Sequence, residues 1–197
     1  MSDATASEAD AVLDFWFGAS GSSEFGRARK AWFSKDAAFD ATVRDRFGAL
    51  VERALRGELE AWGAGPRSSL AQILLLDQFT RNAFRGTTRS FAGDARALAA
   101  ASRMVGSRQD VALAPFMRAF VYLPFEHAEG LAMQDEAIRL FTKLVNEAPE
   151  HADMLAYAHR HRDVIERFGR FPHRNEILGR QSTAEEIAFV KQPGSAF

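Results

Sequence analysis

The sequence predicts an all-α protein built from antiparallel helical hairpins, and three observations lead to this fold class. Apolar residues recur every three or four positions along most of the chain, which is the spacing of one helix face. No convincing run of alternating apolar and polar residues indicates a strand. Capping residues, Gly and Pro divide the chain at short intervals, and short connections make neighbouring helices antiparallel. We expect eight or nine helices that form antiparallel hairpins.

The N-terminal part of the chain should contain three helices. Ser7 is a suitable N-cap for the first helix, and Gly18 follows its last apolar residue. A second helix is expected over residues 25–33. Asp36 then caps a long helix that runs to about Arg56 and carries an apolar stripe along one face.

The middle of the chain should begin with a central helix. The GAGP sequence at 63–66 interrupts the helical pattern, and Ser68 or Ser69 is a suitable N-cap after it. The helix that follows runs to about Asn82 and is apolar nearly all round in its first half, which is typical of a buried helix. Two further helices should cover residues 91–105 and 109–121.

The C-terminal part should contain two long helices. Pro124 suits the first turn of a helix that reaches about Val145. The next helix covers residues 151–168, and Gly169 is well placed just beyond its C-terminal end. Phe171 precedes a proline, which biases it to an extended conformation.

The chain should end with short elements. A short helix is expected at 174–178, and a last helix near 184–191 has a capping box formed by Ser182 or Thr183 with Glu185 or Glu186. We expect one domain over residues 1–197, with residues 1–6 and 192–197 frayed.

Composition limits the kinds of protein this can be. The 197 residues carry a net charge of −1 and no cysteine. A nucleic-acid-binding protein normally has a basic excess, so we expect no nucleic-acid partner. The longest apolar runs are too short to cross a bilayer, and the acidic N-terminus lacks a signal-peptide pattern, so we expect a cytoplasmic protein without a membrane partner. An apolar helix face could support a homodimer.

No high-specificity catalytic motif occurs in the sequence. The nucleophile elbow, the phosphate-binding loop, the dinucleotide fingerprint and the zinc-protease motif are all absent. The short runs EHAE and HRH have no established metal-binding spacing. We therefore expect no metal site and no cofactor; the alternative is a zinc or manganese site formed by His127, His161, His173 and a carboxylate. Any site must be inferred from three polar clusters that interrupt the apolar pattern.

The first cluster lies in LDQFTRNAFRG (76–86). Asp77 and Arg81 are four residues apart on a helix, as are Gln78 and Asn82, and Arg85 follows one turn later. One interpretation is a buried Asp77–Arg81 pair that fixes packing. The other is that Arg81 and Arg85 present their forked donors to a carboxylate or phosphate ligand.

The second cluster lies in LPFEHAEG (123–130). Glu126 and His127 are expected at a helix N-terminus, where the backbone favours an anion and disfavours a protonated imidazole. A neutral His127 could act as a base, with Glu126 or Glu129 as its partner. In the structural alternative the carboxylates only complement the helix dipole.

The third cluster is FGRFPHRN (168–175) with the helix before it. His161 lies on the apolar face of that helix, where a core histidine is the usual interpretation, whereas His159 should face outward. Between 159 and 180 six Arg face two Glu and one Asp, so most of these arginines need acidic partners elsewhere or an anion. Arg170, His173 and Arg174 are therefore candidates for ligand contact.

Several long segments resemble one bacterial family. They are VLDFWFG (12–18), KAWFSKDAAFDATVRDRF (30–47), LLLDQFTRNAFRGTTRSFAGDARAL (74–98), YLPFEHAEGLAMQDEAIRLF (122–141) and HRDVIERFGRFPHRNEILGRQSTAEEIAFV (161–190). Together they are similar, in order and over nearly the whole chain, to the bacterial domain-of-unknown-function 924 family. The resemblance implies an all-helical fold like tetratricopeptide superhelices, and it implies no activity.

The hallmark residues of that family coincide with the three clusters. They fall on Asp77, Gln78, Arg81, Asn82, Arg85, Gly86, His127, Glu129, Gly169, Arg170, Pro172, His173, Arg174 and Asn175. The chain departs from the family pattern at Thr80, where Pro is usual, and at Ala128, where Ser is frequent. The first departure affects helix geometry, and the second removes a hydroxyl from the second cluster.

Three functional interpretations follow. In the first, the clusters converge on a pocket for a small anionic molecule, with His127, His173 and Glu126 as acid–base groups of an enzyme. Asp77, Gln78, Arg81, Asn82, Arg85, Glu129, His161, Arg170, Arg174 and Asn175 would then bind the ligand. In the second, the helical array is an interaction scaffold for an acidic peptide. In the third, the clusters form a buried network that sets the fold.

Overall fold

The structure, a computed structural model, describes the backbone of residues 3–195 and the side chains of residues 7–195. Its regular elements are all helical over this range, which confirms the all-α class. Nine α-helical elements occur in the described range, or eight when α3 and α4 are counted as one helix. The tetratricopeptide-like arrangement stays a prediction. Fraying is expected at residues 1–6 and 192–197; of these, residues 1–2 and 196–197 lie outside the described residues, and residues 3–6 are helical.

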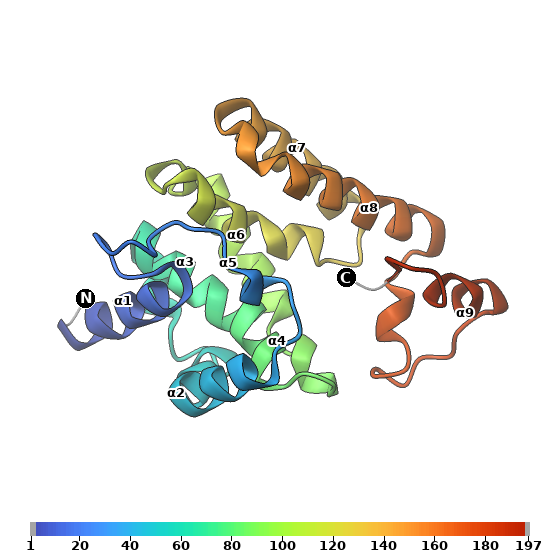
Figure 1. Cartoon of the computed structure of the whole chain (residues 1–197), viewed down its shortest axis with the longest axis horizontal. Coiled ribbons are helices and arrows are strands. Elements are labelled where there is room, and N and C mark those ends of the chain that lie inside the picture. The colour runs from blue at the N-terminus through green and yellow to red at the C-terminus, as the bar shows by residue number, and fades with distance from the viewer. Residues whose placement is uncertain (1–2, 196–197) are drawn as a thin grey trace. The chain divides into compact units, whose positions relative to one another are not determined.

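The described residues group into two compact units, and we treat each by itself. Unit 1 comprises residues 3–85 and 89–124, and unit 2 comprises residues 86–88 and 125–195. The helices of unit 1 are α1 (Asp3–Phe17), α2 (Ala37–Leu55), α3 (Pro66–Leu74), α4 (Thr80–Ala83), α5 (Asp94–Gly106) and most of α6 (Pro115–Glu126) (Figure 1). Those of unit 2 are α7 (Leu131–Glu147), α8 (Ala152–Phe168) and α9 (Ala184–Val190).

The centre of unit 1 is α3. Seven consecutive residues from Ser68 to Leu74 are buried, because α1 and α5 both pack against this helix. This confirms that a helix with apolar residues nearly all round is central. The rings of Trp16, Phe79 and Phe120 extend the same core, with ring centroids 5.2 and 5.7 Å from that of Trp16.

A π-helical turn at Leu75–Phe79 joins α3 to α4. The N–H of Thr80 donates to the carbonyl of Leu75, five residues earlier, and the Thr80 hydroxyl donates to the same oxygen at 2.8 Å. Thr80 therefore stabilises the wider turn through two donors. Such turns often occur at functional sites, and this one contains Asp77 and Gln78.

Gly93, the N-cap residue of α5, lies directly against the backbone of the π-helical turn. A Cβ atom at this position would lie 2.0 Å from the carbonyl oxygen of Leu76, which is backbone and cannot rotate away. We expect Gly93→Ala to lower the free energy of unfolding by about 1–3 kcal/mol through overpacking. Gly106→Ala, which would meet no atom within 4 Å, is the matched control and should be neutral or slightly stabilising. Urea denaturation of both variants tests this; equal stability would show that the helices separate without cost.

Three expectations for unit 1 are wrong. Residues 25–33 contain only a 3-10 turn at Lys30–Trp32, and side chains of this segment bond to carbonyl groups of α1: the Trp32 indole donates to Trp16 at 3.0 Å and Nη1 of Arg29 donates to Phe15 at 2.6 Å. The first helix begins at Asp3, four residues before Ser7. Neither predicted serine caps α3.

The true start of α3 is Pro66, whose fixed φ and missing N–H suit a first helical position. Gly65 occupies the N-cap, and the hydroxyl of Ser68 donates to the carbonyl of Trp62 at 2.7 Å. The helix expected at 109–121 also begins later, at Pro115, after a 3-10 turn at Asp110–Ala112.

In unit 2, α7 and α8 form a helical hairpin and lie side by side in Figure 1. A connection of only four residues, Ala148–His151, makes the two helices antiparallel. Gly169 ends α8 in the left-handed region with φ of 67°, as predicted. Phe171 is extended before Pro172, also as predicted.

Two further capping predictions are confirmed. Asp36 accepts from the N–H groups of Ala38 and Phe39 at the start of α2. Thr183 and Glu186 form the complete capping box of α9. The short helix expected at 174–178 is wrong, because the 3-10 turn occupies Pro172–Arg174 instead.

The expectation for Pro124 is wrong and affects the second cluster. Pro124 lies inside α6, near its C-terminal end, and the next helix begins only at Leu131. Glu126 is the last residue of α6, and His127 follows it in a turn. These residues are therefore at the carbonyl end of a helix, so the argument that a helix N-terminus keeps His127 neutral does not apply.

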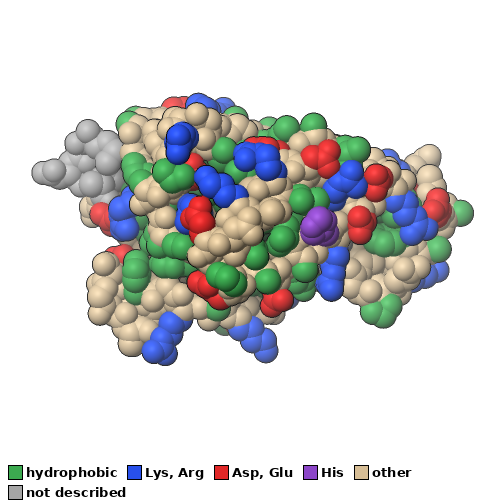
Figure 2. All heavy atoms as spheres, turned by 90° about the horizontal axis from the view of Figure 1, so that it is seen from above, with side chains coloured by type: hydrophobic (Ala, Val, Ile, Leu, Met, Phe, Trp, Pro, Cys, Tyr) green, Lys and Arg blue, Asp and Glu red, His purple; other side chains and the backbone are tan. Residues whose placement is uncertain are grey.

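Acidic and basic side chains are interspersed on the face drawn in Figure 2. Exposed Arg–carboxylate pairs also occur in the described range, for example Arg67–Asp10 with 2.8 Å between Nη2 and Oδ1. No helix in the described range has both the length and the apolar character needed to cross a membrane.

Candidate functional site

The first cluster lies in unit 1, where acidic side chains surround Arg81. Nη1 of Arg81 lies 2.7 Å from Oδ1 of Asp94 and 3.5 Å from Oδ1 of Asp77. Burial acts to lower the pKa of Arg81, but Asp77 and Asp94 outweigh it and raise that pKa above its ordinary value. Asp77 also accepts from Nε2 of Gln78 at 2.6 Å. The Asp77–Arg81 pair predicted from the four-residue spacing is thus present.

Arg85 and Asn82 share a second carboxylate, that of Asp40 on α2. Nη2 of Arg85 and Nδ2 of Asn82 donate to Oδ1 of Asp40 at 2.9 and 2.7 Å, and Nε of Arg85 donates to Oδ2. Burial acts to raise the pKa of Asp40, but the bonds from Arg85 and Asn82 lower it below its ordinary value. The polar groups of α4 are therefore tied to α2.

Sequence reasoning missed both counter-ions of this cluster, Asp40 and Asp94. Asp40 had a detectable signal, because it precedes Val43 by three positions and Phe47 by seven and so lies on the apolar face of α2. An acidic residue on such a face needs a buried partner. Asp94 had no comparable signal, since an acidic residue in the first turn of a helix is common.

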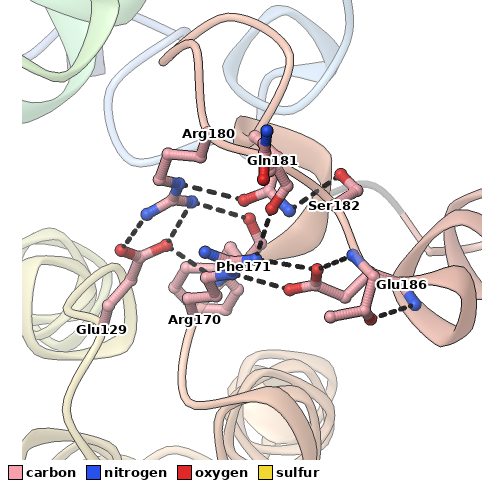
Figure 3. A network of polar contacts seen from close by, with 9 residues as sticks. Glu129, Arg170, Phe171, Arg180, Gln181, Ser182 and Glu186 are labelled. Carbon is pink, nitrogen blue, oxygen red and sulfur yellow. Dashed lines mark hydrogen bonds and ion pairs between the residues drawn. The ribbon is translucent and has the colours of Figure 1, made fainter.

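In unit 2 an outer network of Glu129, Arg170, Asn175, Arg180 and Glu186 fixes the loop after α8 (Figure 3). Arg170 donates to both carboxylate oxygens of Glu186, at 2.6 and 2.8 Å. Arg180 donates to both oxygens of Glu129, at 2.6 and 2.9 Å. Oδ1 of Asn175 accepts from Nε of Arg180 at 2.9 Å. Each member therefore has a partner within the network.

The electrostatics of the outer network follow from these bonds. The hydrogen bonds from Arg170 lower the pKa of Glu186 to about 2, although burial opposes this. Burial likewise acts to raise the pKa of Glu129, but Arg180 and the N–H of Phe171 lower it below its ordinary value. Sequence reasoning recognised Glu186 only as a helix cap and missed Arg180.

Phe171 is the centre around which the polar groups of unit 2 are arranged. Its ring is fully buried. Its N–H donates to Oε1 of Glu129 at 2.8 Å, and its carbonyl accepts from Nη2 of Arg180 at 3.1 Å. The guanidinium carbon of Arg174 lies 4.5 Å from the ring centroid, and the rings of His161 and His173 lie at 5.5 and 5.7 Å. FGRFPHRN thus positions polar groups around one aromatic anchor.

A second group, which we call the histidine cluster, consists of Glu126, His127, His161, His173 and Arg174. His161 and Glu126 are buried at its base, with 3.1 Å between Nδ1 and Oε1. Nδ1 of His161 also lies 2.9 Å from the carbonyl of Tyr157. Burial lowers the pKa of His161 to about 3, and positive charge on Arg174 and the neighbouring imidazoles acts in the same direction. The His161 ring is therefore neutral at pH 7.

His127 and His173 are the half-buried members of the cluster. The ring of His127 lies 6.3 Å from that of His161, and both His127 and His173 interact electrostatically with it. The prediction that His161 faces inward and His159 outward is confirmed, although Tyr157, four residues before His161 on the same helix, is exposed. Residues from the second and third clusters are thus side by side in unit 2.

Gln134 on α7 holds the turn that carries His127. Its Nε2 donates to the carbonyl oxygens of Glu126 and Ala128, both at 2.7 Å. A side-chain donor thereby satisfies carbonyl groups that the end of α6 leaves without helical partners. No sequence motif indicated this capping role for Gln134.

Asp77, Gln78, Arg81, Asn82 and Arg85 belong to unit 1, and their convergence with the other predicted residues stays a prediction. Within unit 2, Glu126, His127, His161, His173 and Arg174 come together, while Glu129, Arg170 and Asn175 belong to the outer network. In the described part of the chain no group of three or more His, Asp or Glu side chains is arranged to hold a metal ion.

Comparisons with known proteins agree with this description and add no activity. The family model described as bacterial protein of unknown function (DUF924) matches residues 12–194. A solved structure of a protein of unknown function from Agrobacterium tumefaciens is 43% identical, with a TM-score of 0.83 over 95% of this chain and 98% of that chain. Among curated proteins none matches. The chain therefore belongs to the DUF924 family of bacterial proteins of unknown function.

Proposed function

We propose that the chain binds a small anionic molecule at the histidine cluster and that His127 or His173 exchanges a proton with it. The observation that carries this proposal is the convergence of two imidazoles, those of His161 and His173, and one guanidinium around Phe171, with the imidazole of His127 6.3 Å from that of His161. Ionisable side chains whose pKa is shifted by burial and by neighbouring charges, as for His161, cluster at catalytic and binding sites, which supports a functional role for this group.

Arg174 is the permanent cation of the proposed site. Its side chain is buried, and its guanidinium lies over the Phe171 ring, which fixes the plane of the forked donors. A guanidinium held in this way suits the planar arrangement of oxygens in a carboxylate or phosphate. His127 and His173 retain accessible surface, so they are the members that a ligand can reach.

His161 and Glu126 are positioning residues in this proposal. His161 is kept neutral by burial, so it adds no charge, and its Nδ1 lies 2.9 Å from the carbonyl of Tyr157 and 3.1 Å from Oε1 of Glu126, which positions the ring. Histidine is the side chain whose ordinary pKa lies closest to neutral pH, which suits His127 and His173 to proton exchange. The positive charge of the cluster should increase when they are protonated, and anion affinity should increase with it.

The outer network has a different part in the proposal. The carboxylates of Glu129 and Glu186 neutralise Arg180 and Arg170 by paired hydrogen bonds, so these two arginines hold the loop in place. In unit 1 the bonds of Arg81 and Arg85 to Asp94 and Asp40 likewise support a structural role. The proposed ligand site is therefore smaller than the set of residues selected from the sequence.

Thermal denaturation with a series of anions tests the proposal. A ligand at about 100 times its dissociation constant should add about 2.7 kcal/mol to the free energy of unfolding, which raises Tm by several degrees. We expect such a shift with phosphate, sulfate or a dicarboxylate in the wild type and a much smaller one in His173→Gln and Arg174→Lys. The rise in Tm caused by sulfate should be larger at pH 6 than at pH 8. Sulfate has the same charge at both pH values, so the difference reports on the protein.

The matched control is His159→Gln, because His159 is exposed on α8 and lies outside the cluster. Sulfate and phosphate stabilise many proteins without specific binding, so the difference between His173→Gln and His159→Gln is the decisive quantity. Equal shifts in both variants, or a response only to acidic peptides, would contradict the small-anion site.

A further inference from the structure

The connection between α1 and α2 in unit 1 (Figure 1) presents an aromatic ring to solvent. Phe33 is 68% exposed, the highest value among the exposed large apolar side chains of the described range. Its ring lies 6.3 Å from that of the half-buried Trp32 and is stacked on that of Phe120 at the same centroid distance. A single exposed apolar side chain is ordinary, so the case for an interaction surface depends on what surrounds the ring.

The segment that carries Phe33 is fixed to α1. Nη1 of Arg29 donates to the carbonyl of Phe15 at 2.6 Å, and the Trp32 indole donates to that of Trp16 at 3.0 Å. A ring on a backbone that is already held in place loses little conformational freedom when a partner covers it. Phe33 is therefore suited to anchor a binding partner.

The charges around the ring are all basic. The stretch 25–35 contains four Lys or Arg and no acidic residue. Three of these cations are exposed and have no carboxylate partner among the described residues, namely Arg27, Lys30 and Lys35. Arg89, by contrast, is exposed but pairs with Glu52 at 2.6 Å. The acidic residue that follows the stretch, Asp36, is engaged as the N-cap of α2. We call Trp32, Phe33 and the three cations the basic–aromatic patch.

The number of cations selects the class of partner. Recognition of anionic lipid by basic clusters uses about four to eight Lys or Arg. Nucleic-acid binding depends on many phosphate contacts along a basic surface, whereas this chain has a net charge of −1. Three cations beside one aromatic ring instead match a few carboxylates beside one apolar side chain, which is the composition of a short acidic peptide segment.

We propose that the basic–aromatic patch binds an acidic peptide segment of a partner protein, in which Asp or Glu residues flank one apolar side chain. The apolar side chain covers Phe33, and the carboxylates pair with the cations that precede and follow this ring in the chain. Charge complementarity speeds association and excludes basic partners, while the buried aromatic contact supplies affinity. The surface belongs to unit 1 and is independent of the anion site proposed in unit 2.

Fluorescence anisotropy of labelled synthetic peptides with the full-length protein tests the proposal. Each probe is a short peptide in which a central Leu, Phe or Trp has Glu residues on both sides. We expect at least one probe to bind saturably, with an affinity that falls as the NaCl concentration rises. Control peptides with Gln in place of every Glu, or with Ala in place of the central residue, should bind about tenfold more weakly or less.

Substitutions in the patch should weaken binding without changing Tm, because the altered side chains are exposed. Phe33→Ser should weaken it by about tenfold or more, and the double variant Lys30→Glu/Lys35→Glu should also remove most of the salt dependence. Two matched controls should bind as the wild type does. Val111→Ser changes an exposed apolar side chain of unit 1 outside the patch, and Lys143→Glu changes an exposed lysine of unit 2.

The contradicting results are equally specific. The proposal is overturned if no probe binds at millimolar concentration, or if Phe33→Ser binds as tightly as the wild type. It is also overturned if the peptide with a central Ala binds as tightly as the others, because attraction would then be purely ionic. Tighter binding to phosphatidylserine vesicles or to an oligothymidine strand would assign the patch to a membrane or nucleic acid instead. His173→Gln should leave peptide binding unchanged, which separates this surface from the anion site.

Discussion

Replacing Arg81 with methionine should destabilise the protein by about 3–5 kcal/mol, the range for removing one partner of a buried ion pair. Asp77 is only 1% exposed, and Arg81 is the guanidinium that lies 3.5 Å from it and 2.7 Å from Asp94. Removal of the cation leaves two carboxylates close together in a poorly solvated place. Urea denaturation followed by circular dichroism measures the loss.

Arg96→Met is the matched control for this substitution. Arg96 pairs with Glu60, but 45% and 52% of the two side chains are exposed, so we expect a loss of at most about 1 kcal/mol. The double variant Arg81→Met/Asp77→Leu should recover a large part of the lost stability, because it removes a buried carboxylate together with its cation. A loss for Arg81→Met no larger than for Arg96→Met would show that the cluster does not stabilise unit 1.

Acidification from pH 7 to pH 5 should destabilise the protein through His161. The pKa of His161 is about 3 in the folded chain because the ring is buried, against 6.5 for an ordinary histidine. Between these values the unfolded chain binds a proton that the folded chain does not, so the free energy of unfolding falls as pH falls. Through His161 the free energy of unfolding falls by up to about 1.4 kcal/mol per pH unit. The total loss between pH 7 and pH 5 is about 2 kcal/mol.

His161→Gln tests this, because glutamine retains a donor toward Tyr157 and Glu126 but does not titrate. The variant should lose less stability between pH 7 and pH 5, whereas His127, His173, Arg174 and Glu126 remain around the site in both proteins. The pH range of this measurement ends above pH 4.5, because below that value protonation of Glu186 lowers the free energy of unfolding further. If the Glu126 carboxylate at 3.1 Å outweighed burial, the wild type would instead gain stability on acidification.

Local signals in the sequence were sufficient for most helix ends. Asp36, Gly169 and Thr183 act within a few residues of the ends they determine, so their effects were predictable. The errors arose where distant contacts decide the conformation. The segment before Phe33 bonds to carbonyl groups of α1, and Pro124 is tolerated in α6, so neither outcome follows from local propensity.

The candidate site was predictable in its residue types and less so in its pairing. The Asp77–Arg81 pair follows from helical spacing, because both residues lie on one helix. In contrast, Arg85 finds its carboxylate 45 positions away in the sequence, at Asp40. Arg180 and Glu129 are likewise 51 positions apart. Partners at such separations depend on how helices pack, which the spacing of residues along one helix does not encode.

The most direct test of the proposed anion site is an NMR titration of the five histidine side chains with sulfate at pH 6.5. His151 and His159 are internal controls, because His159 is exposed and His151 lies in the turn before α8, at the opposite end of that helix from the loop that carries His173. We predict saturable shifts for the imidazole signals of His127 and His173 and none for His151 and His159. Equal, non-saturating shifts of all five signals, or no shift at His127 and His173, would contradict the account.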